Sequence, residues 1–112
     1  MELNTTRVVK RISSQEFKDL VKKYSSCIEI SPHALDHLSN AQRKIFDEKY
    51  LVNPLLSENP IFIGLQKNGR YAVLYRRKDY FLKIILVEKL KSIEVVTFIN
   101  TKKAPVLIQN EN

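Results

Sequence analysis

Residues 61–77, IFIGLQKNGRYAVLYRR, combine two apolar runs with a tight turn signal between them. The runs at 61–66 and 71–77 are rich in Ile, Leu, Val and Tyr, residue types that favour half-buried strands. Asn68-Gly69 separates them, and this dipeptide is the strongest short-range hairpin signal in a sequence. The segment therefore predicts a β-hairpin at the centre of the fold.

Two further strand-like runs follow, YFLKIILVE at 80–88 and SIEVVTFI at 92–99. Only RKD and KLK separate the runs, and links this short join antiparallel neighbours. The second half of the chain thus predicts a four-stranded antiparallel meander.

Upstream of the hairpin, the apolar period changes from two residues to that of a helix. Ser13 and Glu16 have the spacing of a capping box, which predicts a helix of about 12 residues. Ser31-Pro32 predicts the start of a second helix over 31–48, with residues 52–60 as a connection. The CIEI segment at 27–30 is interpreted as a short strand or extended bridge. The predicted fold class is α+β, with two N-terminal helices packed on the four-stranded meander.

A chain of 112 residues with 44% hydrophobic content suits one domain. We expect a loose arm or short edge strand at 1–12, a core at 13–100 and a tail at 101–112. The single cysteine, Cys27, is expected to be a small buried hydrophobe. The apolar runs are too short to cross a membrane, so we expect a soluble, cytoplasmic protein.

The chain carries 19 Lys and Arg against 12 Asp and Glu, a net charge of +7. Such an excess at this size favours a polyanionic partner, because the summed positive field concentrates phosphate near the surface. Nucleic acid is the expected partner, with RNA favoured over DNA. A basic domain with no such partner is the alternative.

The two histidines, His33 and His37, stand four residues apart in the second predicted helix. This spacing allows two imidazoles to hold one zinc ion, but the sequence offers no further histidine and no usable cysteine. We therefore expect no metal and no cofactor. Two interpretations remain: ordinary surface residues, or an acid–base pair.

Metal-independent RNA cleavage needs a base for the 2′-OH, an acid for the leaving oxygen and a cation at the phosphate. His33 and His37 suit the proton transfers, since imidazole titrates near neutral pH. Arg43 and Lys83 are candidates for the cation, and Lys83 interrupts an otherwise apolar strand. Thr97, assigned to the same strand face as Val95 and Ile99, can donate a hydrogen bond to phosphate.

The segments SPHALDHLSNAQRKI, LLSENPIFI, KNGRYAVLY and EVVTFI, in this order, resemble small members of the barnase–EndoU–colicin–RelE group. In the nucleases of that group, a helix histidine, a nearby Arg or Lys, and a Thr or Ser on the last strand form the active site. Matched by position, these residues are His33, Arg43 and Thr97. His37 stands where many relatives carry arginine. Many members are toxins, so the resemblance also implies an antitoxin-like protein as a second class of partner.

The sequence therefore predicts a metal-independent endoribonuclease that attacks the phosphodiester with the 2′-OH. The alternative is a non-catalytic nucleic-acid-binding module. It would use the aromatic and basic residues of the hairpin to stack bases and hold phosphates. Those residues are Arg70, Tyr71, Tyr75, Arg76 and Arg77.

Overall fold

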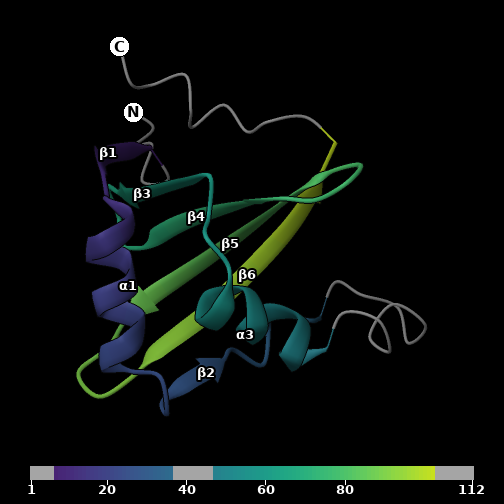
Figure 1. Ribbon diagram of the computed structural model, residues 1–112. Coiled ribbons are helices and arrows are strands. Elements are labelled where there is room, and N and C mark those ends of the chain that lie inside the picture. Colours follow the sequence, from purple (N-terminus) through teal and green to yellow (C-terminus); the bar gives the residue numbers. More distant parts are fainter. Residues whose placement is uncertain (1–6, 37–46, 103–112) are drawn as a thin grey trace, which may run out of the picture.

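The computed structural model describes residues 7–36 and 47–102, which form a sheet with helices on one side (Figure 1). No helix in these residues has the length and apolar character that a membrane span requires. In chain order the elements are β1 (Val8–Arg11), α1 (Ser14–Lys23), β2 (Ile28–Ile30), α3 (Glu48–Ser57), β3 (Phe62–Gln66), β4 (Tyr71–Arg76), β5 (Phe81–Glu88) and β6 (Ile93–Thr101).

The sheet has six strands in the order β1-β3-β4-β5-β6-β2. The predicted four-stranded antiparallel meander was wrong, because two short strands extend the sheet at its edges. β1 pairs antiparallel with β3, and β2 pairs parallel with β6, which makes the sheet mixed. Strands β3 to β6 are antiparallel neighbours. The added strands satisfy backbone groups of β3 and β6 that a four-stranded sheet would leave unpaired.

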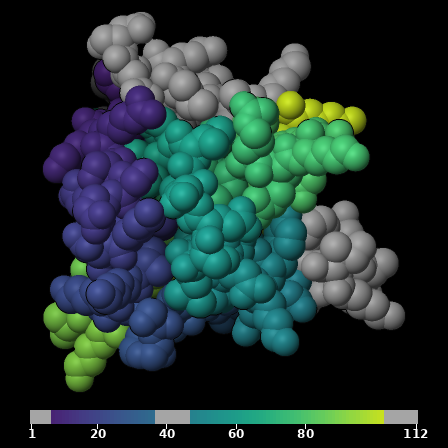
Figure 2. Space-filling model, viewed as in Figure 1, coloured from purple at the N-terminus to yellow at the C-terminus, as the bar shows by residue number. Residues whose placement is uncertain are grey.

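Both described helices cover the same face of the sheet, here called the inner face (Figure 1). Most of the buried apolar side chains lie between this face and the helices, including Phe17, Leu51, Val73 and Phe98. In Figure 2, which views the molecule from this side, the helices and their flanking segments hide most of the sheet. A smaller apolar cluster lies on the opposite, outer face.

The β3–β4 hairpin closes through Asn68 and Gly69. Gly69 has a φ of +87°, whereas none of the described non-glycine residues has a positive φ. The turn therefore needs only one left-handed residue, as in hairpins with a type I turn followed by glycine. The backbone N–H of Arg70 also donates to the Asn68 side chain. The glycine sets the register that pairs Leu65 with Tyr71.

Helix α1 begins as the sequence predicts. The N–H of Glu16 donates to the Ser13 hydroxyl at 3.1 Å, which satisfies one of the backbone donors at the helix start. Phe17 and Val21 lie one turn apart and are both buried against the sheet.

Most of the second predicted helix, 31–48, lies outside the described residues, which leave out 37–46. At its predicted start, residues 32–36 form turns, with the N–H of Ala34 donating to the Ser31 carbonyl. The predicted connection at 52–60 was wrong, because helix α3 spans Glu48–Ser57, and Asp47 caps it by accepting from the Tyr50 N–H. Pro54 lies inside this helix, where proline ordinarily costs about 3 kcal/mol. Its burial with Leu51 and Leu55 offsets that cost.

Cys27 is exposed, not buried as expected. It lies in the link between α1 and β2, one residue before the strand whose apolar side chains pack on the core. Cys27 has the same strand parity as the exposed Glu29, so the alternation of β2 itself turns the thiol away from the side of Ile28 and Ile30.

Ser13→Ala should reduce the free energy of unfolding by about 1 kcal/mol, because the cap hydroxyl is lost. Urea unfolding measures this change. Ser14→Ala, one position inside α1, is the matched control and should change stability by less. Equal effects of the two substitutions would contradict the capping role.

Candidate functional site

The outer face of the sheet presents its side chains in rows that the strand register defines. One row runs from Arg11 through Gly64, Ala72 and Ile85 to Thr97, and the next runs from Phe62 through Leu74 and Lys83 to Ile99. A third row joins Arg76, Phe81 and Thr101. No described helix covers these rows, and Ile99 is 48% exposed.

A β-bulge decides the face on which Thr97 lies. Val95 packs on the inner face opposite Leu86, whereas Thr97 pairs with Ile85 of the outer cluster. The register shift between Ile85 and Leu86 leaves Val96 as the extra residue. The expectation that Thr97 and Val95 share a face was wrong, because simple alternation does not include the bulge. Thr97 and Ile99 do share the outer face.

Lys83 lies in the middle of the outer face, between Leu74 on β4 and Ile99 on β6. Thr97 is the diagonal neighbour of Lys83, a position about 7–8 Å away in antiparallel sheets. Burial lowers the pKa of the Lys83 ammonium, since apolar surroundings disfavour the charged form. The register thus places a partly desolvated cation beside a hydroxyl, two groups that can bind one anion together.

Two arginines of the outer face stack on aromatic rings. The guanidinium carbon of Arg76 lies 5.1 Å from the centroid of the Phe81 ring. Arg11 lies 4.9 Å from the centroid of Phe62. Both distances fall within the range of cation–π contacts. The outer face therefore carries three cations together with two aromatic rings.

The hairpin residues of the binding-module hypothesis divide between the two faces. Tyr75 is 1% exposed and lies in the inner core, so its ring is not available to stack on a base. Tyr71 also packs against the inner core. Arg70 is exposed beside the β3–β4 turn, and Arg76 is exposed on the outer face.

Arg77 lies on the inner side of the sheet, where it forms an ion pair with Glu58. Its Nη1 donates to Glu58 Oε1 at 2.8 Å and its Nη2 to Oε2 at 3.3 Å. Burial acts to lower the pKa of Arg77, but the bonded Glu58 carboxylate outweighs burial, and the net pKa is raised. Arg77 therefore supports the fold between α3 and β4 and has little capacity left for a phosphate.

A hydrogen-bonded cluster near this ion pair consists of the side chains of Tyr50, Tyr80 and Asn100. The hydroxyls of Tyr50 and Tyr80 are 3.1 Å apart, and Tyr50 donates to Asn100 Oδ1 at 3.4 Å. Burial, followed by the hydrogen bond with Tyr80, raises the pKa of Tyr50. The Tyr50 phenol therefore stays protonated at neutral pH and serves as a hydrogen-bonding group.

His33 lies in the turn after β2, and its side chain is 87% exposed. Its Nδ1 is 2.9 Å from Asp36 Oδ2. A carboxylate only accepts, so Nδ1 carries the proton and Nε2 has the lone pair when the ring is neutral. Ser31, two residues earlier, donates its N–H to the Val95 carbonyl of β6. This bond holds the His33 turn at the sheet edge next to β6, and Leu35 of the same turn packs on the inner core. Among the described residues, no contact joins His33 to Lys83 or Thr97 on the outer face.

His37 and Arg43 lie outside the described residues. Among the residues 7–36 and 47–102, no three His, Cys, Asp or Glu side chains are grouped so that they would hold a metal ion.

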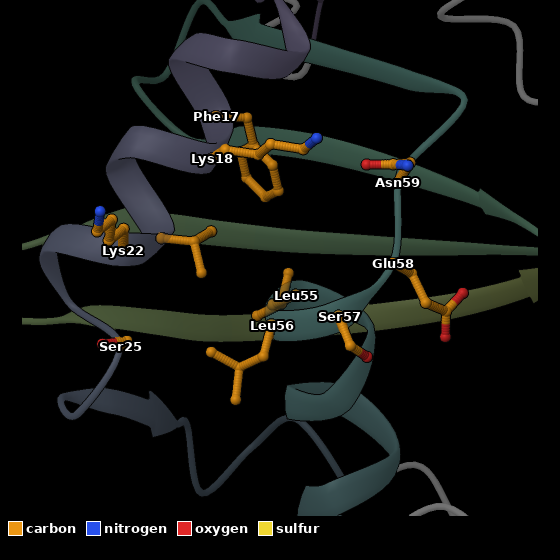
Figure 3. Close-up of a pocket in the computed structure, with 10 residues that line it drawn as sticks. Phe17, Lys18, Lys22, Ser25, Leu55, Leu56, Ser57, Glu58 and Asn59 are labelled. Atoms are coloured by element: carbon orange, nitrogen blue, oxygen red, sulfur yellow. The ribbon is translucent and has the colours of Figure 1, made fainter.

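A groove of about 510 Å³ lies between α1 and α3 on the inner side (Figure 3). Phe17 and Leu55 contribute apolar side chains to it, and Leu56 is 50% exposed. The Lys18 side chain extends across the groove toward Asn59 in Figure 3. The lining also includes polar and charged residues, so the groove is as much polar as apolar: Lys18, Lys22, Ser25, Ser57, Glu58 and Asn59.

Sequence reasoning missed the aromatic residues of the outer face. Along β5, apolar residues occupy both faces of the strand, so the sequence does not show which face is buried. The outer face carries Phe81, Lys83 and Ile85, and the inner face carries Leu82, Ile84 and Leu86. The short turn between β4 and β5 brings Arg76 and Phe81 opposite each other. This pairing was the sequence feature that could have revealed the aromatic residue. Strand parity alone places Arg76 on the face opposite Tyr75 and Arg77.

Comparison of the chain with protein-family models, with curated proteins and with solved structures gives no match.

Stability should rise with pH wherever the unfolded chain binds more protons than the folded chain. The folded pKa of Lys83 lies below its ordinary value of 10.5, so between these values folding releases a proton and rising pH stabilises the protein. Below the lowered pKa, the folded protein bears the full cost of the desolvated charge.

Lys83→Met removes this cost. At neutral pH we expect the variant to match or slightly exceed wild-type stability, with a change of about 0.5 kcal/mol or less. The difference should shrink as the pH approaches 10.5. Urea unfolding at neutral and alkaline pH measures both effects. A strong loss of stability in the variant would mean that the ammonium makes a stabilising contact, contrary to this account.

Proposed function

We propose that the protein is a metal-independent ribonuclease that binds RNA on the outer face of its sheet. One observation carries the proposal: Lys83 and Thr97 are diagonal neighbours on this face, at the centre of a surface that also holds Arg76 and Arg11. The net charge of +7 supports a polyanionic ligand.

Lys83 and Thr97 would hold the scissile phosphate through its non-bridging oxygens. The Lys83 ammonium is already partly desolvated by its apolar neighbours, so an arriving phosphate displaces little water from it. Attack by the 2′-oxygen adds negative charge to these phosphate oxygens. A fixed cation and a fixed donor stabilise that charge more than they stabilise the ground state.

The proton transfers would involve the histidines. The 2′-OH gives its proton to Nε2 of His33, the 2′-oxygen bonds to phosphorus, and the bond to the 5′-oxygen breaks. The departing oxygen takes a proton from the second carrier, for which His37 stays the candidate. The products are a 2′,3′-cyclic phosphate and a 5′-hydroxyl, and the dependence on the 2′-OH restricts cleavage to RNA.

The second candidate function is a non-catalytic RNA-binding module on the same face. The stack of Arg76 on Phe81 favours it, and so do the contacts of the His33 side chain, which bonds to Asp36 within its own turn. In this alternative the hairpin contributes Arg76, while Tyr75 and Arg77 support the core.

Incubation with mixed RNA in the presence of EDTA, followed by analysis of the fragment ends, separates the two functions. We expect cyclic phosphate ends, a loss of cleavage of about 10²- to 10⁴-fold in His33→Ala, and a loss of about 10²-fold in Lys83→Gln. Lys22→Gln, which removes the same charge from exposed α1, is the control and should cleave nearly as well as wild type. RNA binding without cleavage would leave the binding module. A protein that binds no RNA at low salt would refute both functions.

A further inference from the structure

The pair of Arg76 and Phe81 has the form of a platform for an unpaired base. Arg76 is exposed, its guanidinium lies 5.1 Å from the Phe81 centroid, and no carboxylate among the described residues contacts it. The neighbouring Arg77, by contrast, is bound to Glu58 through both of its terminal nitrogens. Of the two consecutive arginines, Arg77 is thus paired with a carboxylate, whereas the Arg76 guanidinium is stacked on an aromatic ring.

The surroundings of this pair include a second cation. Phe81 is half-buried, and Thr101 pairs across from it. A hollow of about 280 Å³ at this end of the sheet is lined by Asp79, Tyr80, Asn100, Thr101 and Lys102, and neither Arg76 nor Phe81 lines it. Lys83 lies two residues from Phe81 on the same strand face, about 7 Å along β5. A nucleotide stacked on the pair would therefore have a phosphate-binding cation one step away.

We propose that the outer face selects single-stranded RNA by stacking one unpaired base on the Arg76–Phe81 pair. This inference rests on the proposed function, because it requires that RNA bind to this face. Aromatic rings and guanidinium planes both stack on bases that are splayed out of a helix. In a duplex the bases are already stacked on one another, and the A-form major groove is too narrow for side chains to read. Duplex RNA would gain only the phosphate contacts of Lys83 and Arg11.

Fluorescence anisotropy with two probes tests the selection. The probes are a 5′-labelled oligo-U decamer and a labelled 20-base-pair duplex, both 2′-O-methylated so that cleavage does not interfere. We expect wild type to bind the single strand about 5- to 150-fold more tightly, the worth of one stacked base. Arg76→Lys keeps the charge but loses the planar group, so it should abolish the preference and leave duplex binding nearly unchanged. Phe81→Leu should weaken the preference in the same way.

Arg7→Lys is the matched control, since Arg7 is exposed just before β1 and its carbonyl accepts from the Lys67 N–H near the β3–β4 turn, at the opposite end of β4 from Arg76. It should keep the wild-type preference. Equal affinity of wild type for the two probes, or a preference that survives both Arg76→Lys and Phe81→Leu, would refute the stacking inference while RNA binding stands. Failure to bind either probe at low salt would refute the proposed function itself.

Discussion

The bulge in β6 is the constraint on which the candidate site depends. The register shift after Ile85 allows both Val95 and Phe98 to enter the inner core, although they are three positions apart and would lie on opposite faces of a regular strand. Both side chains are buried, so the hydrophobic contacts of the core hold the bulge in place. Thr97 consequently turns to the outer face beside Lys83. Bulges are known to re-aim side chains next to functional sites, and here packing on one face sets the polar geometry of the other.

The sequence was sufficient for the elements that carry strong local signals. Asn68-Gly69 predicted the hairpin, and Ser13 with Glu16 predicted the start of α1. It was insufficient for α3, because Pro54 suggested a connection and the burial of Leu51 and Leu55 against the sheet is a tertiary effect. It was also insufficient for the sheet edges. β2 has three residues, and its parallel pairing with β6 joins segments more than sixty residues apart, which no local pattern encodes.

The same limits apply to the candidate site. Lys83 could be identified from the sequence because a lysine within an apolar strand is unusual. The structure places it between Leu74 and Ile99 on the outer face. The hairpin residues were grouped by composition, whereas strand alternation separates Tyr75 from Arg76. Sequence distance also hid the link between His33 and β6, which depends on one backbone hydrogen bond between Ser31 and Val95.

The two edge strands have a further consequence for the behaviour of the protein at high concentration. Exposed backbone groups at a sheet edge invite strands from other molecules, and proteins reduce this risk with short or charged edges. β1 has four residues and exposes Lys10 and Arg11, while β2 has three and exposes Glu29 at its centre. An incoming chain would meet few backbone partners and a fixed charge at either border. The long apolar strands β4 and β5, which would aggregate most readily, are shielded in the interior of the sheet.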